Sequence, residues 1–250
     1  MILNYLKTAI RRLLRNKSIS VINIVGLSLG MAVTFVILIF VFHELSYDNY
    51  HKKKDRIYRV LQENKNIDMT MTHTPYPMAE VLKEEYPEIE QTARVFGLFN
   101  TQVMKGQQFI EETNFFCVDK ELFDILSLPL INGDPEEILN EPNDVVLTES
   151  IARKYFGDLN IVGKELVIKN AGDEIRLNVS GVMENVPVNS TFKPGFLVPI
   201  DLSLSRYNKI VKSSNKQEFS RKHIRNSWED GLFMTYVLTA RPVAPQSFED

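Results

Sequence analysis

The longest apolar run of the chain lies near its N-terminus and extends over residues 19–42 without a charged side chain. Its 24 residues would form about 36 Å of α-helix, which is enough to cross a hydrocarbon core of roughly 30 Å. A cleaved signal peptide has an apolar core of only about 7–15 residues and ends in small residues. This run ends in the bulky pair Val41-Phe42. The pattern therefore predicts an uncleaved transmembrane helix.

A second helical pattern precedes this run. At 100° per residue, five apolar side chains fall within one arc of about 100°, and basic groups occupy the opposite arc. The apolar set is Leu3, Leu6, Ile10, Leu13 and Leu14, and the basic set is Arg11, Arg12 and Arg15. This predicts an amphipathic helix over residues 1–18 on the inner membrane surface. It fits either an ordinary basic flank or a docking element for a cytoplasmic partner.

The charges that flank the span predict its orientation. Residues 1–17 carry five basic groups and no acid, whereas Glu44 and Asp48 follow the span. Cytoplasmic flanks carry an excess of Lys and Arg, so the N-terminus is expected inside the cell. The basic run 52–54 weakens this asymmetry without reversing it. Residues 43–250 would then form a domain outside the cytoplasm, in the periplasm of a bacterium.

Small and polar residues within the span predict helical neighbours. Gly26 and Gly30 form a small-xxx-small pair, which allows another backbone to approach closely. Asn23 adds a polar side chain that lipid cannot satisfy. We therefore take Asn23, Gly26 and Gly30 as candidate packing residues of the membrane helix.

After the span, short runs rich in β-branched and aromatic residues alternate with turn signals. A helix is predicted over 78–85 before Pro87, and another begins after Thr148 as its N-cap and ends at Gly157. The predicted strands are 57–60, 92–99, 145–147, 165–169, 175–182, 196–200 and 233–239, and the segment 107–118 is predicted to contain strands as well. The polar segment 203–230 has room for a helix. Because no regular βαβ repeat is present, the fold class is α+β, with two subdomains expected.

Composition and charge exclude several classes of protein. Hydrophobic residues make up 44% of the chain and charged residues 24%, which are ordinary globular values. Beyond the basic N-terminus the chain is acidic, and this argues against a nucleic-acid-binding protein. The lone cysteine, Cys117, excludes an intrachain disulfide and any site with several cysteine ligands.

No stretch of the sequence predicts catalysis, a bound cofactor or a metal site. The segment 157–165 has five residues between its glycines and Glu165 after its lysine, so it departs from a phosphate-binding loop. The four histidines, at positions 43, 51, 73 and 223, are scattered without zinc-ligand spacing. Cys117 lies in an aromatic run, which favours a buried, inert thiol. We therefore assign no catalytic, cofactor-binding or metal-binding residue.

A series of short motifs nevertheless resembles a known family over essentially the whole chain. The series comprises the basic start and the anchor, then 47–51, 56–60, 86–90, 94–95, 115–119 with Phe123, 128–135, 146–157, 161–164, 181–187, 189–190, Trp228 and 235–237. In this order the motifs resemble the N-terminal part of MacB/FtsX-like ABC transporter permeases. The likeness is to the MacB-like periplasmic core domain in the form found in Bacteroidetes-type bacteria.

The resemblance implies a mechanotransmitting permease subunit rather than an enzyme. Its place would be the bacterial inner membrane, with a periplasmic core domain that responds to a cytoplasmic ABC ATPase, and the ATPase would bind the ATP. Relatives export drugs, peptides, toxins or lipoproteins, so efflux is one implied role. The implied partners are a second copy or further permease segments, and a periplasmic adaptor or substrate.

One departure from the family leaves alternatives open. A complete permease of this kind has further membrane helices after the periplasmic domain, whereas this sequence ends at Asp250. We therefore expect a fragment, a frameshifted product or one piece of a split permease. The alternative is an autonomous, single-span binding or sensory module. A third hypothesis, a periplasmic hydrolase, has no residues in its favour.

Overall fold

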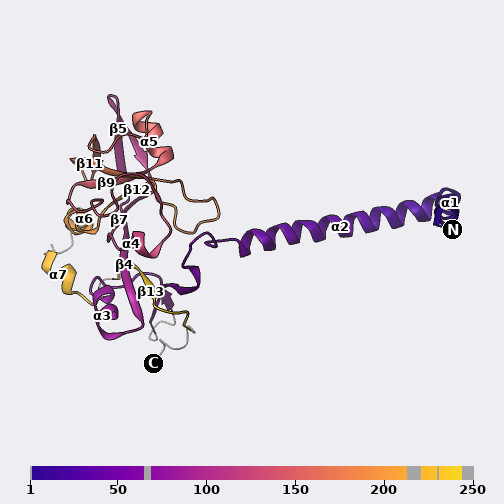
Figure 1. Cartoon of the computed structure of the whole chain (residues 1–250), viewed down its shortest axis with the longest axis horizontal. Helices are drawn as coiled ribbons and strands as arrows, with labels where there is room; N and C mark the ends of the chain where they lie inside the picture. Colours follow the sequence, from indigo (N-terminus) through magenta and orange to yellow (C-terminus); the bar gives the residue numbers. More distant parts are fainter. Residues whose placement is uncertain (1, 65–68, 213–220, 230, 244–250) are drawn as a thin grey trace. The chain divides into compact units, whose positions relative to one another are not determined.

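A computed structural model of the chain describes residues 2–64, 69–212, 221–229 and 231–243 (Figure 1). It divides into two compact units, residues 1–49 and residues 50–250. We call the first the anchor unit and the second the sheet domain, and we describe each by itself.

The anchor unit consists of two helices, α1 (Ile2–Arg15) and α2 (Lys17–Leu45). Of the described residues, only α2 forms a helix long and apolar enough to cross a membrane. Its 29 residues correspond to about 43 Å of helix. The predicted span 19–42 lies within its bounds. The two helices meet at Asn16, whose N–H donates to the carbonyl of Arg12.

The sheet domain contains one large mixed sheet and one small hairpin. The strands of the large sheet are β1 (Ile57–Arg59), β4 (Ile89–Gly97), β5 (Thr101–Lys105), β6 (Gln108–Glu112), β7 (Phe115–Val118), β8 (Leu130–Asn132), β9 (Asp144–Thr148), β10 (Glu165–Asn170), β11 (Asp173–Met183), β12 (Phe196–Pro199) and β13 (Met234–Thr239). The hairpin pairs β2 (Gln62–Asn64) with β3 (Met69–Met71).

In the described part of the sheet domain, five α-helices lie between strands in the sequence. They are α3 (Met78–Glu85), α4 (Leu122–Ile125), α5 (Glu149–Phe156), α6 (Ile200–Lys212) and α7 (Arg221–Asn226), and a short 3₁₀ turn covers Lys54–Arg56. The helix predicted over 78–85 is confirmed, and a helix is confirmed in the described part of the polar segment. Gly157 ends α5 with a φ of 71°, as predicted for a left-handed C-terminal residue. Thr148 stands at the N-cap, but its hydroxyl bonds Ser150 Oγ instead of a helix N–H.

The strand order of the large sheet is β1-β13-β4-β7-β12-β9-β11-β10-β5-β6, and β8 pairs with β11 beside this path. Two pairs are parallel, β9 with β11 and β7 with β12, and the other pairs are antiparallel. A parallel pair requires a crossover, and the chain between β9 and β11 contains α5 and β10. The mixed sheet with helices outside a regular βαβ repeat confirms the α+β prediction.

The central strands are buried on both faces because their side chains alternate between two hydrophobic clusters. In β12, Phe196 and Val198 join one cluster and Leu197 joins the other. The first cluster also receives residues of α5, α6 and α7, and the second receives residues of α4. The described strands from β1 to β13 thus form one continuous large sheet within the compact unit 50–250. The two subdomains that we expected in this unit stay a prediction.

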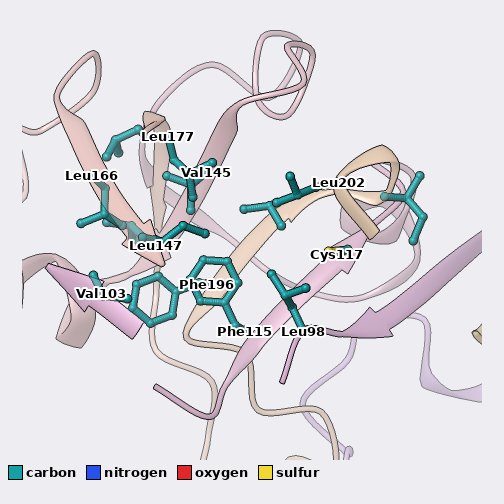
Figure 2. Close-up of a cluster of buried hydrophobic side chains, with 14 of the residues drawn as sticks. Leu98, Val103, Phe115, Cys117, Val145, Leu147, Leu166, Leu177, Phe196 and Leu202 are labelled. Atoms are coloured by element: carbon teal, nitrogen blue, oxygen red, sulfur yellow. The ribbon is translucent and has the colours of Figure 1, made fainter. Parts of the chain in front are cut away.

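The first cluster centres on two stacked phenyl rings (Figure 2). The rings of Phe115 and Phe196 lie 4.6 Å apart, centroid to centroid, at an interplanar angle of 12°. Figure 2 shows leucine and valine side chains from neighbouring strands packed around them, with Cys117 on the same strand as Phe115. These rings join β7 and β12, the parallel pair at the middle of the strand order.

This packing predicts a large loss of stability for Phe196→Ala. The ring is fully buried, so its removal leaves a cavity and is expected to lower the free energy of unfolding by about 3–5 kcal/mol. The control is Phe99→Ala, whose side chain is 72% exposed and should change the same free energy by less than about 0.5 kcal/mol. Denaturant unfolding of the full chain in detergent, followed by circular dichroism, checks both values. Equal losses would contradict the assigned core.

Candidate functional site

The three predicted packing residues share one face of the membrane helix. Gly30 follows Gly26 by four positions and Asn23 by seven, and both spacings bring residues to the same side of a helix. A shallow hollow at the two glycines is bounded by Leu27, Met31, Thr34 and Phe35. Within the described chain, a Cβ built on either glycine would meet no atom within 4 Å outside its own helix backbone. The face is thus open to a close neighbour, whose presence stays a prediction.

The three predicted surface arginines lie in the second half of α1. Arg11, Arg12 and Arg15 are all exposed. Arg12 and Arg15 lie in the last turn, where a positive charge complements the helix macrodipole. The side chains of Leu3, Leu6 and Ile10 lie outside the described ones, so the apolar face of α1 rests on the sequence pattern. A helix over residues 2–15 is confirmed, and its place on a membrane surface stays a prediction.

The chain enters and leaves the sheet domain through neighbouring strands. β1 pairs antiparallel with β13, with Tyr58 opposite Val237. Arg56 Nη1 donates to the carbonyls of Thr239 and Ala240 at 3.1 and 3.0 Å. The Tyr58 hydroxyl donates to the carbonyl of Val243 at 2.8 Å and accepts from its N–H at 3.0 Å. We call these side-chain contacts the latch, because they tie the start of the first strand to the end of the last.

A buried ion pair joins β4 to the loop before α4. Arg94 Nε donates to Asp119 Oδ2 at 2.8 Å and Arg94 Nη2 to Asp119 Oδ1 at 3.1 Å. The guanidinium also lies 3.8 Å from the ring centroid of Tyr76 and donates to Glu80 at 3.2 Å. Burial acts to lower the pKa of Arg94, but the hydrogen bonds and charge of Asp119 outweigh it and raise that pKa. The cluster fixes α3 against the sheet.

The remaining candidates for chemistry have structural explanations. Among the described residues, no group of three or more His, Cys, Asp or Glu side chains could hold a metal ion. Burial raises the pKa of the Cys117 thiol, so it stays protonated and a poor nucleophile. His51 is buried and its Nδ1 accepts from the N–H of Ser127 at 3.1 Å. Gly157 and Gly163 both have positive φ, so the backbone turn itself requires glycine.

The family of the chain follows from its sequence. The model of the MacB-like periplasmic core domain matches residues 20–250. The chain belongs to this family. The match includes most of the anchor helix and all of the sheet domain, and it confirms the resemblance drawn from the motif series. No curated protein matches this sequence.

One solved structure supports the fold of this MacB-like domain, and two others show a weaker likeness. A permease domain from Porphyromonas gingivalis superposes with a TM-score of 0.61 at 20% identity, covering 79% of this chain and 81% of that one. The periplasmic region of MacB from Actinobacillus actinomycetemcomitans gives a TM-score of 0.49 at 14% identity, covering 79% and 82%. The extracellular domain of the ABC-type transporter YknZ from Gram-positive bacteria gives 0.44 at 12% identity, covering 78% and 86%.

The family and the apolar helix together define the general character of the protein. It is a membrane-anchored protein with a MacB-like periplasmic domain. Its family consists of components of ABC-type permeases, which work with cytoplasmic ATPases, rather than of classical enzymes. Arg56, Tyr58 and Arg94 belong to motifs of the family-like series, but no pattern in the sequence predicted the latch or the buried ion pair.

The buried ion pair predicts a marked difference between two arginine substitutions. Arg94→Met leaves the Asp119 carboxylate, 11% exposed, without its counter-ion, and should lower the free energy of unfolding by about 3–5 kcal/mol. The matched control is Arg176→Met, which breaks an exposed pair with Glu165 and should cost about 0–1 kcal/mol. Denaturant unfolding of the full chain measures both. Similar small losses would show that the Arg94 pair does not hold the fold.

Proposed function

We propose that the chain is a permease subunit, or the N-terminal part of one, of an ABC transporter of the MacB/FtsX type. It couples ATP hydrolysis by a cytoplasmic partner to rearrangement of the periplasmic domain, in export or in mechanotransmission. The N-terminus lies in the cytoplasm and the anchor crosses the inner membrane. ATP is bound by the partner ATPase.

The latch is the observation that supports this coupling most directly. A displacement of the anchor reaches the sheet domain first at residues 51–53, which bond to residues 124 and 127, and then along the chain that leads into β1. β1 is an edge strand that pairs with β13 on one side. A pull on the preceding chain would therefore break the hydrogen bonds between β1 and β13 one after another, beginning at Ile57. The bonds of Arg56 and Tyr58 to residues 239, 240 and 243 lie at this end. They oppose unzipping, so the sheet domain would move as a body.

The anchor unit carries the surfaces through which partners would act. Arg11, Arg12 and Arg15 present three guanidinium groups near the end of α1, where an ATPase could bind. Asn23, Gly26 and Gly30 form a helix face that suits a second copy or further permease segments. In this proposal α1 receives the movement and α2 transmits it.

The proposal predicts that an ABC ATPase is captured with the full chain from membranes. In Arg11→Lys/Arg12→Lys/Arg15→Lys the positive charge and the membrane orientation are retained, but the bidentate guanidinium contacts are lost. ATPase recovery should then fall by about fivefold or more. The measurement is quantitative mass spectrometry of the captured complexes. Lys105→Arg/Lys164→Arg, which changes two exposed lysines of the sheet domain, is the matched control.

Two results would contradict parts of this account. Unchanged recovery with the triple variant would reduce α1 to an ordinary basic flank. Capture of neither an ABC ATPase nor any permease segment with the unaltered chain would overturn the coupling function. The autonomous binding or sensory module would then be the better account of the chain.

A further inference from the structure

A groove of about 540 Å³ lies on the sheet domain between three segments that are far apart in the sequence. Tyr50, Lys52 and Lys53 form one wall, residues 123–129 the second, and residues 184–187 the third. This volume falls within the range of small-molecule sites, about 300–1,000 Å³. No predicted site residue lies in it.

The interior of the groove is apolar. Ile125, Leu126 and Leu128 are buried beneath it, and Phe123 and Val186 are half-buried beside them. Two further lining residues, Pro129 and Pro187, have no N–H to offer a ligand. Such a surface favours hydrocarbon over a polar solute.

Charged side chains of both signs surround this interior. Lys52 and Lys53 line the wall that follows the anchor, and Asp124 and Glu184 line the other two walls. Lys53 Nζ donates to the carbonyl of Asp124 at 2.8 Å, and the N–H of Lys52 donates to Ser127 Oγ at 2.8 Å. These bonds hold the basic wall against the second segment, so the groove is already formed without a ligand.

The basic wall is tied covalently to the membrane helix. α2 ends at Leu45, and Lys52 follows seven residues later. Seven residues span at most about 25 Å. Wherever the two units lie relative to each other, Lys52 therefore stays within this reach of the end of the span. Phospholipid headgroups are the amphipathic molecules most concentrated in that zone.

We propose that this groove binds one glycerophospholipid of the ethanolamine type from the surrounding membrane. The phosphate pairs with Lys52 and Lys53, and the ammonium group donates to the carboxylates of Asp124 and Glu184. The glycerol and the first methylenes lie on the apolar interior. This charge pattern matches a zwitterionic headgroup better than a purely anionic one. The inference goes beyond the coupling function and does not depend on it.

Native mass spectrometry of the delipidated full chain in detergent tests this assignment. Titration with phosphatidylethanolamine should show one molecule bound. Phosphatidylcholine has the same phosphate but no N–H donors, so it should bind at least fivefold more weakly. Lys52→Glu/Lys53→Glu should weaken phosphatidylethanolamine binding at least tenfold. Lys105→Glu/Lys164→Glu reverses two exposed lysines outside the groove and should leave binding unchanged.

A second pair of variants tests the interior without altering charge. Val186→Phe places a larger side chain in the groove and should abolish binding. Val188→Phe makes the same change two residues away, at a side chain that is 83% exposed and outside the groove, and should bind as the unaltered chain does. Circular dichroism checks that all variants fold.

Three outcomes would overturn the lipid assignment. They are equal binding of both phospholipids, unchanged binding in both groove variants, and equal losses in the groove variants and their controls. Each would indicate ordinary lipid around the anchor helix. None would affect capture of the ATPase, so failure of this inference and failure of the proposed function are distinguishable.

Discussion

The pairing of β1 with β13 is the constraint on which the organisation of the sheet domain depends. These strands are separated by most of the chain, yet they lie side by side with Ile57 opposite Leu238. β13 then pairs with β4, and the sheet continues from there to β6. All the other described strands thus lie between β1 and β13 in the sequence. Because Arg56 binds Thr239 and Ala240 and Tyr58 binds Val243, the start of β1 and the end of β13 are held together at one edge of the sheet.

Two kinds of interaction stabilise the large sheet. Alternating side chains bury the central strands on both faces, and the stacked rings of Phe115 and Phe196 join the middle pair. The charged pair of Arg94 and Asp119 adds a directional contact between β4 and the loop before α4. Hydrophobic burial supplies most of the favourable free energy of folding, whereas the buried ion pair allows few alternative arrangements of its partners.

Local signals explain the elements that could be predicted from the sequence. The apolar run predicted the span. The 3.6-residue period and Pro87 predicted the helix over 78–85, and Gly157 predicted the end of α5. β8 was missed because it is short and pairs with β11, which comes much later in the chain. β5 was missed although it forms a local hairpin with β6, with Gly106 in the turn between them. α4 has only four residues, which is too few for a periodic pattern. The latch and the groove join residues more than 70 positions apart, and no local pattern records such contacts.

The continuous large sheet is another feature that no local pattern records. It joins strands from both ends of the sheet domain, such as β1 with β13, and the two expected subdomains stay a prediction. The family could be assigned without knowing the strand pairing, because the assignment rested on the order of the motifs.

Hydrogen exchange of the full chain, followed by mass spectrometry, tests the central claim most directly. The account predicts that peptides covering 57–60 and 234–239 are protected to the same extent, because the two strands open together. Tyr58→Phe removes the hydroxyl that binds Val243 and should accelerate exchange in the peptide covering β1. Free exchange in β1 with protection in β13 would contradict this account, and so would an unchanged exchange rate in Tyr58→Phe. Either result would mean that the latch does not hold the start of β1 to the end of β13.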